Sequence, residues 1–240
     1  NHKGKININI TRKKQLPFSA EEELSSEIEK IEISDNGVGF TEENRNSFNT
    51  LYSPHKQSNG GKGLGSMFYI KFFNDVTIES TFFEKSLKTR FFKFGKKYDI
   101  VENEQIKESD DKMTTGAKIT LANYCGPTKK FNDPTDTFAH RILERILNYF
   151  VKDNYECPVI TLTDGNNKIV LNDQIGDNQQ CKISLIGDGA INIIYNEDKA
   201  ETFGFKVFKL HRVHTQISRI MLTANNKVVT DAKLEDYIPE

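Results

Sequence analysis

The sequence predicts an α+β protein: a two-layer α/β sandwich whose sheet is mixed and mainly antiparallel, followed by a smaller α+β domain. Three observations lead to this prediction. Apolar and polar residues alternate over 5–11 and 27–34, a pattern typical of strands with one buried face. Two apolar runs at 75–83 and 87–94, separated by a short turn, indicate a second pair of strands. A glycine-rich turn then leads into an apolar segment at 64–74, which fits a helix.

The remaining elements divide the chain into two predicted domains. A strand at 116–122 closes the first domain, which we place at 1–125. The stretch 126–135, with two prolines and two lysines, reads as a connector into a second domain at 126–240. In the first domain, the acidic stretch 102–112 is expected to be a surface excursion. The second domain is expected to open with a helix at 136–152. Its predicted strands are 159–163, 168–171, 182–186, 203–210 and 219–224, the last of which is followed by a tight turn at Asn225 and Asn226.

The composition excludes several classes of protein. Of the 240 residues 36% are hydrophobic and 28% are charged, which is enough apolar content for a core and excludes wholesale disorder. The net charge of -1 gives no general attraction to nucleic acid or anionic membrane. No apolar run reaches membrane length and no secretory signal is visible, so we expect a cytoplasmic location and no membrane partner. The widely spaced Cys125, Cys157 and Cys181 are expected to be buried, reduced thiols, and no metal site is assigned.

The second predicted strand ends in an acid followed by two glycines. A carboxylate can only accept hydrogen bonds, so Asp35 suits an exocyclic amine such as that of adenine. Gly37 and Gly39 lack Cβ atoms, which would let a purine lie against their backbone. Taken in isolation, a plain Asp-Asn-Gly turn that closes a strand explains the same residues equally well.

A second glycine-rich element, Gly-Gly-Lys-Gly-Leu-Gly-Ser, occupies 60–66 just before the predicted helix. Backbone N–H groups at a helix start have no partner within the helix and, with the helix dipole, favour a phosphate. The element is not a P-loop, because Gly63 follows Lys62, and its spacing is not that of the dinucleotide fingerprint. The two glycine elements in this order predict a nucleotide site.

Residues 35–40 (Asp-Asn-Gly-Val-Gly-Phe) and 60–65 (Gly-Gly-Lys-Gly-Leu-Gly) resemble the second and third nucleotide motifs of the GHKL superfamily of Bergerat-fold ATPases. This superfamily includes gyrase B, the ninety-kilodalton heat-shock chaperones, histidine kinases, MutL and the MORC ATPases. The resemblance implies ATP and Mg²⁺ as cofactors, with Asp35 reading the adenine amine and Gly37 and Gly39 lining the adenine pocket. It also implies that the phosphates are wrapped by Gly61, Lys62, Gly63, Leu64, Gly65 and Ser66.

The chain departs from the family pattern in three ways. The family's first motif, a helix with a water-activating glutamate and an Mg²⁺-binding asparagine, is not found before the first strand, so the catalytic residues are unknown and we expect that helix upstream of Asn1. In the fourth motif Ala117 stands at the usual threonine position, so Thr115 or Thr120 would have to supply the hydroxyl. A lysine that some relatives contribute from a second domain would lie beyond residue 240, past which we expect the chain to continue.

The resemblance implies a module that binds and hydrolyses ATP, orders a lid formed by 42–59, and dimerises with nucleotide to act on a partner. The hairpin at 220–229 resembles the end of a MutL- or MORC-like transducer domain. Three alternatives stay open: an ATP-sensing dimerisation module without turnover, a histidine kinase, and a DNA-handling ATPase of the mismatch-repair, topoisomerase or phage-defence kind. The kinase is disfavoured by the strand-rich second domain. The client, protein or DNA, is not readable from the residues.

Overall fold

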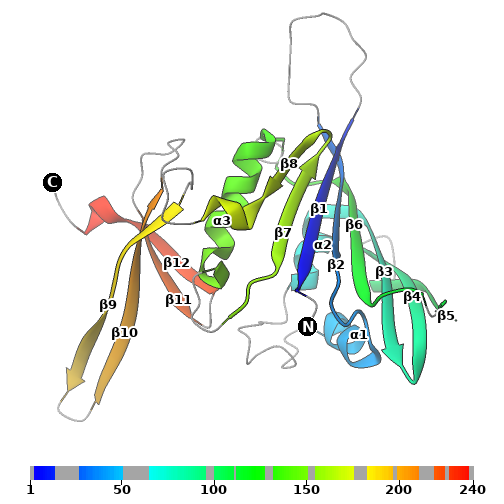
Figure 1. Cartoon of the computed structure of the whole chain (residues 1–240), viewed down its shortest axis with the longest axis horizontal. Helices are drawn as coiled ribbons and strands as arrows, with labels where there is room; N and C mark the ends of the chain where they lie inside the picture. Colours follow the sequence, from blue (N-terminus) through cyan, green and yellow to red (C-terminus); the bar gives the residue numbers. More distant parts are fainter. Residues whose placement is uncertain are drawn as a thin grey trace, which may run out of the picture. The chain divides into compact units, whose positions relative to one another are not determined.

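The alternating segments of the sequence form strands, and the structure places most of them in one sheet (Figure 1). The structure is a computed structural model that describes residues 3–13, 27–50, 65–95, 100–110, 112–127, 132–150, 155–175, 183–196, 199–210, 219–224 and 227–237. Its first compact unit comprises Asn1–Val170 with Leu222–Val229, and its second Leu171–Met221 with Thr230–Glu240. In the described part of the chain, no helix has the length and apolar character needed to cross a membrane.

The main sheet has eight strands in the order β5-β4-β3-β6-β2-β1-β7-β8. All neighbours are antiparallel except β1 and β7, so the prediction of a mixed, mainly antiparallel sheet is confirmed. The strands are β1 (Lys5–Arg12), β2 (Ile28–Asp35), β3 (Phe73–Glu84), β4 (Ser86–Gly95), β5 (Ile100–Glu108), β6 (Gly116–Tyr124), β7 (Val159–Asp164) and β8 (Asn167–Val170).

Two sequence predictions differ from this sheet. The acidic stretch 102–112, expected to be a surface excursion, largely forms the edge strand β5, because pairing with β4 satisfies its backbone groups despite its charge. The boundary expected at residue 125 falls inside the first compact unit, which extends to Val170 because β7 pairs in parallel with β1. The register makes β6 and β7 run in the same direction, so the chain between them must cross from one end of the sheet to the other. The helix α3 (Thr135–Phe150) lies in this crossover connection.

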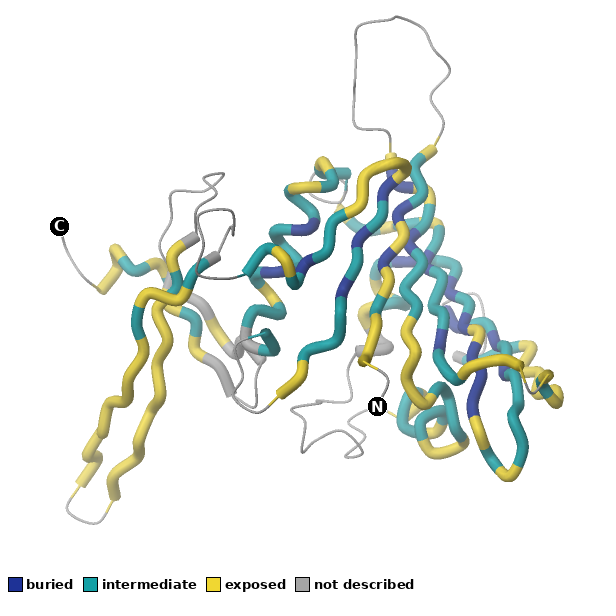
Figure 2. The backbone as a smooth tube through the Cα atoms, viewed as in Figure 1, coloured by how far each residue is buried: buried dark blue, intermediate teal, exposed yellow. Residues whose placement is uncertain are grey.

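Buried residues lie along the strands of the sheet (Figure 2), and the register places most of the buried apolar side chains on one face, which holds the core. Directly opposed residues share a face, so the register fixes which side chains lie together. Buried residues of the apolar face include Ile8, Ile31, Leu121, Ile78, Phe92 and Leu162. The other face carries polar residues: Thr120 pairs with Glu32 and Thr77, and Lys118 pairs with Ser34 and Glu79.

The helices α1 (Glu42–Asn49) and α2 (Gly65–Phe72) lie on the apolar face. From α1, the ring of Phe48 packs against Phe94 with 4.8 Å between centroids and against Phe92 with 6.0 Å. The sequence shows no period over 42–59, yet 42–49 form a helix. The Thr41 side chain caps the start of the helix by accepting a hydrogen bond from the N–H of Asn44 at 3.3 Å, and Phe48 packs the side of the helix that faces the sheet. Residues 51–64, the rest of the predicted lid, lie outside the described residues.

Within the second unit the main element is a long two-stranded ribbon of β9 (Ile183–Asn196) and β10 (Lys199–Leu210). The sequence predicted strands only at 182–186 and 203–210, because the glycines at 187 and 189 and the polar residues near the turn are poor strand formers. Cross-strand pairing extends both strands past them. The predicted final hairpin is present as β11 (Arg219–Ala224) and β12 (Lys227–Lys233), while its assignment to a transducer domain stays a prediction.

Short 3₁₀ helices occur at Leu171–Gln174 and Leu234–Asp236. Among the thiols, Cys125 is exposed rather than buried as expected, and Cys157 is half-buried. Cys181 lies outside the described residues. In the described part of the chain, no group of three His, Cys, Asp or Glu side chains could hold a metal ion.

Candidate nucleotide site

Asp35 is the last residue of β2 and lies on the helix-bearing face of the sheet. Its register partners are Ile6 on β1 and Ala117 on β6, and the same face continues into the buried Ile31 and Leu121. The Asp35 side chain is exposed. Its Oδ1 accepts the N–H of Gly37 at 2.8 Å, and no described residue donates to Oδ2. The turn thus fixes the carboxylate while leaving an acceptor oxygen for a donor from outside.

Asn36 anchors this turn to the start of β1. Its Oδ1 accepts the backbone N–H of Lys5 at 2.6 Å, and its Nδ2 donates to the carbonyl of Lys3 at 3.2 Å. The backbone N–H of Asn36 also donates to the carbonyl of Lys5 at 3.3 Å. Sequence reasoning assigned Asn36 no role, although an amide side chain can donate and accept at the same time and therefore suits this position.

The segment after the turn crosses closely over the ends of β3 and β6. Gly39 has φ of 75°, and a Cβ built there would lie 2.3 Å from the carbonyl oxygen of Thr81 and 2.7 Å from Ser80 Oγ. Ser80 is 5% exposed; its Oγ accepts the N–H of Phe40 at 2.7 Å and donates to the carbonyl of Gly116 at 2.9 Å. Gly39 therefore has a packing role in this structure, beside the pocket-lining role that the resemblance implies.

The small side chains beneath this segment explain how it fits. Asp35, Ala117, Ser80 and Arg90 are successive register partners across four strands, so they form one row on the helix-bearing face. Alanine and serine in the middle of the row leave space for the backbone of Gly39 to lie over the sheet. Sequence reasoning missed Ser80, because only the register brings it beside the motif.

Next to Asp35 the helix-bearing face is apolar and only half-buried. Ile33 and Ile119 are register partners one step further along β2 and β6, and both are half-buried. Thr120 cannot supply a hydroxyl here, because it pairs with Glu32 and Thr77 on the opposite face. Thr115 directly precedes Gly116, whose missing Cβ would otherwise lie 2.2 Å from the carbonyl oxygen of Asp35.

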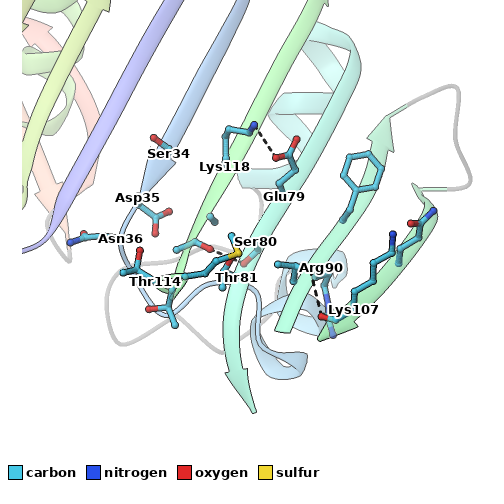
Figure 3. A pocket seen from close by; sticks show the side chains of 17 residues that line it. Ser34, Asp35, Asn36, Glu79, Ser80, Thr81, Arg90, Lys107, Thr114 and Lys118 are labelled. Carbon is cyan, nitrogen blue, oxygen red and sulfur yellow. Dashed lines mark hydrogen bonds and ion pairs between the residues drawn. The ribbon is translucent and has the colours of Figure 1, made fainter. Parts of the chain in front are cut away.

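A cavity of about 590 Å³ lies near the same end of the sheet but opens mainly on the polar face (Figure 3). Its lining includes Ser34, Lys118, Glu79 and Phe91, which pair across the sheet on the face opposite to Asp35. An ion pair of 2.9 Å joins two of these lining residues, Lys118 Nζ and Glu79 Oε2. Asp35 and Thr115 also belong to the lining. This cavity is therefore distinct from the apolar surface of Ile33 and Ile119.

The predicted phosphate residues are only partly described. Gly61, Lys62, Gly63 and Leu64 lie outside the described residues, whereas Gly65 and Ser66 begin α2. The first turn of α2 contains no acidic residue, so no carboxylate of that turn neutralises its dipole. Tyr69 stacks on Phe48 at 6.4 Å, and Phe72 ends the helix where β3 begins.

A charge cluster around the buried Arg90 fixes α1 at the far end of the row of Asp35. Arg90 on β4 is 1% exposed and bonds Glu42 of α1 through Nη2, while its Nε lies 3.5 Å from Glu104 of β5. Arg45 of α1 reaches the same Glu104 at 2.8 Å. The Arg90 guanidinium also lies 4.9 Å from the centroid of the Phe82 ring. The helix that follows the motif is thus tied to the sheet by charge as well as by Phe48.

Comparisons with known proteins give a fold likeness only. No protein-family model matches the sequence, and no curated protein matches it either. Among solved structures, the chain is similar to the ATPase region of Saccharomyces cerevisiae topoisomerase II (16% identity, TM-score 0.40), covering 68% of this chain and 43% of that one. It is also similar to the Aquifex aeolicus MutL ATPase domain complexed with ADP (16% identity, TM-score 0.40), covering 69% and 55%. The chain thus spans about half the length of the structures it matches.

Proposed function

We propose that this chain binds ATP, with the adenine ring on the apolar surface of Ile33 and Ile119 and its amine donating to Asp35. The free acceptor oxygen of Asp35 carries the proposal. The carboxylate is exposed, held in place by the Gly37 N–H, and adjacent to half-buried isoleucines on the helix-bearing face. A purine ring needs an apolar contact surface with a few well-placed polar groups, and this combination supplies both.

The phosphates are assigned to the glycine loop and the start of α2. Gly61, Lys62, Gly63, Leu64, Gly65 and Ser66 are the proposed contacts, on the basis of the loop's composition and of a first helical turn without acids. Thr115 is a further proposed contact of the nucleotide, near the adenine.

Mg²⁺ is expected to arrive with the nucleotide. Magnesium is commonly held by one or two carboxylates together with phosphate oxygens, and the described residues contain no larger cluster of ligands. No described residue is assigned as its ligand or as the base that activates water. The proposal extends to ATP hydrolysis, lid closure and nucleotide-dependent dimerisation, followed by action on a protein or DNA client. All of these steps require that ATP binds at the proposed site.

The test is calorimetric titration of ATP with Mg²⁺ into the full chain and into Asp35→Asn. The amide can still accept the Gly37 N–H but replaces the other oxygen with a donor, so the turn is kept while the adenine amine meets a like group. We expect at least a tenfold loss of affinity. Glu32→Gln is the matched control: it removes one negative charge from the same strand on the opposite face, and its affinity should stay within twofold of the unchanged protein.

Three outcomes separate the readings. Binding that is lost in Asp35→Asn and kept in Glu32→Gln supports the site, and phosphate release would then distinguish an ATPase from an ATP-sensing module. Equal binding by Asp35→Asn and the unchanged protein would remove Asp35 from the site. An absence of binding to the unchanged protein would refute the proposal.

A further inference from the structure

The ribbon of β9 and β10 has one face that is apolar along most of its length. Beginning near the turn, its successive cross-strand pairs are Glu201 with Ile193, Phe203 with Ile191, Phe205 with Gly189, Val207 with Gly187, and Lys209 with Ser184. We call these ten residues the ribbon face. Its five large apolar side chains, those of Ile191, Ile193, Phe203, Phe205 and Val207, are 40% to 55% exposed. Figure 2 shows exposed residues along both strands.

The opposite face of the ribbon is polar in its middle. Thr202 pairs with Asn192, with a hydrogen bond of 2.7 Å between their side chains, and Lys206 pairs with Asp188. Toward its two ends the opposite face is apolar as well, with Ala200 paired to Ile194 and Phe208 to Leu185. The two faces therefore differ chiefly in the middle of the ribbon, where the ribbon face has the pattern of a covered apolar side. A two-stranded hairpin is marginal by itself in water, so covering the apolar side would stabilise it.

The order of residues on the ribbon face makes it complementary to itself. The pair of Phe205 and Gly189 is central, with the bulkier pair of Phe203 and Ile191 on the side toward Glu201 and the less bulky pair of Val207 and Gly187 on the side toward Lys209. If a second ribbon is turned by 180° about an axis through this central pair, Phe203 and Ile191 lie over Val207 and Gly187 of the other copy. At each end Glu201 then meets Lys209, so size and charge match together.

The glycines of β9 support this arrangement. Both lie within a strand, where glycine costs stability and often marks a close approach by another chain. A Cβ at Gly187 would have no neighbour within 4 Å, so the floor there is open. At Gly189 a Cβ would lie 2.8 Å from the Phe205 ring, so that ring lies flat across the glycine and presents its outer side.

We infer that the ribbon face is a self-association surface, on which a second copy of this chain docks face to face about a two-fold axis near Phe205. This isologous contact would not require nucleotide. The face spans about eight residue steps of two strands, which is roughly 300 Å² per copy. A total near 600 Å² is below that of a standard stable interface, so the dimer should form at high micromolar concentration and exchange rapidly.

Charge reversal in the full chain tests this inference. Glu201→Lys alone places lysine opposite Lys209, and Lys209→Glu alone places glutamate opposite Glu201. The double variant restores both attractive contacts with their polarity exchanged. Because each contact occurs twice in the dimer, either single change should weaken self-association roughly tenfold, and the double change should recover most of it. Lys206→Glu on the polar face is the matched control and should leave the association constant unchanged.

Sedimentation velocity from 5 µM to 500 µM, without nucleotide, provides the readout, and circular dichroism checks that each variant keeps its strands. A monomer at every concentration would overturn the inference, and this would hold even if a different protein were found to cover the ribbon face. A dimer that is insensitive to the single reversals, or not restored by the double variant, would place the contact elsewhere. Because no nucleotide is present, failure of the ATP proposal does not affect this result.

Discussion

Substituting Gly39 by alanine tests whether this glycine is required by packing of the sheet. The structure gives two costs. First, φ is 75°, a left-handed conformation that costs about 1–2 kcal/mol for an L-residue with a Cβ. Second, the new Cβ would lie 2.3 Å from the carbonyl oxygen of Thr81 and 2.7 Å from Ser80 Oγ. The backbone must move, and the two hydrogen bonds of Ser80 would weaken, which together add about 2–3 kcal/mol.

The total for Gly39→Ala is therefore about 3–5 kcal/mol, or a fall in melting temperature of roughly 6–20 °C for a unit of this size. The chain supplies a matched control in Gly165, in the turn between β7 and β8. Its φ is 58°, but a Cβ there would have no neighbour within 4 Å. Gly165→Ala carries only the backbone cost and should lower the melting temperature by roughly 2–8 °C.

Differential scanning calorimetry measures both variants, because it resolves the transition of the eight-stranded unit from any other. Equal shifts for the two variants would refute the packing explanation. If Gly39→Ala also matched Gly165→Ala in stability but lost ATP binding, the glycine would act at the nucleotide pocket, as the family resemblance implies, and not through the sheet.

Two further predictions concern the helices on the sheet. Arg90→Met should lower the free energy of unfolding in urea by about 2 kcal/mol, which is below the range for a fully buried pair because Glu42 is 60% exposed. Lys118→Met breaks an exposed pair and should lower it by under about 1 kcal/mol. Similar values for the two would mean that the Arg90 cluster does not hold α1. Burial raises the pKa of Tyr69, so the folded state keeps its proton at a pH where the unfolded chain has lost it. Stability should be complete below about pH 10 and fall as the pH rises above it, and Tyr69→Phe should reduce that fall; a parallel pH dependence for both proteins would exclude Tyr69 as its source.

Local patterns in the sequence were sufficient for much of the first unit. The alternation of Ile6, Ile8 and Ile10 predicted β1, and that of Ile28, Ile31 and Ile33 predicted β2, because a half-buried strand needs apolar residues on one side only. In the structure the two strands pair directly, and Asp35 is the last residue of β2. The mainly antiparallel character of the sheet is confirmed too.

Long-range pairing decided what the local patterns could not. The acidic stretch became β5 only because β4 offers it a partner, and β9 extends through glycines only because β10 pairs with it. In both cases hydrogen bonds between distant residues outweigh a weak local preference.

The candidate site divides in the same way. The sequence by itself determined that an acid, two glycines and a glycine loop occur in the order that suits a nucleotide. Only the tertiary structure decided that Asp35 shares the helix-bearing face with Ile33 and Ile119, that Thr120 lies on the other side, and that Ser80 holds Phe40. The physical reason is that the face of a residue depends on strand register, and register is set by contacts between segments far apart in the chain.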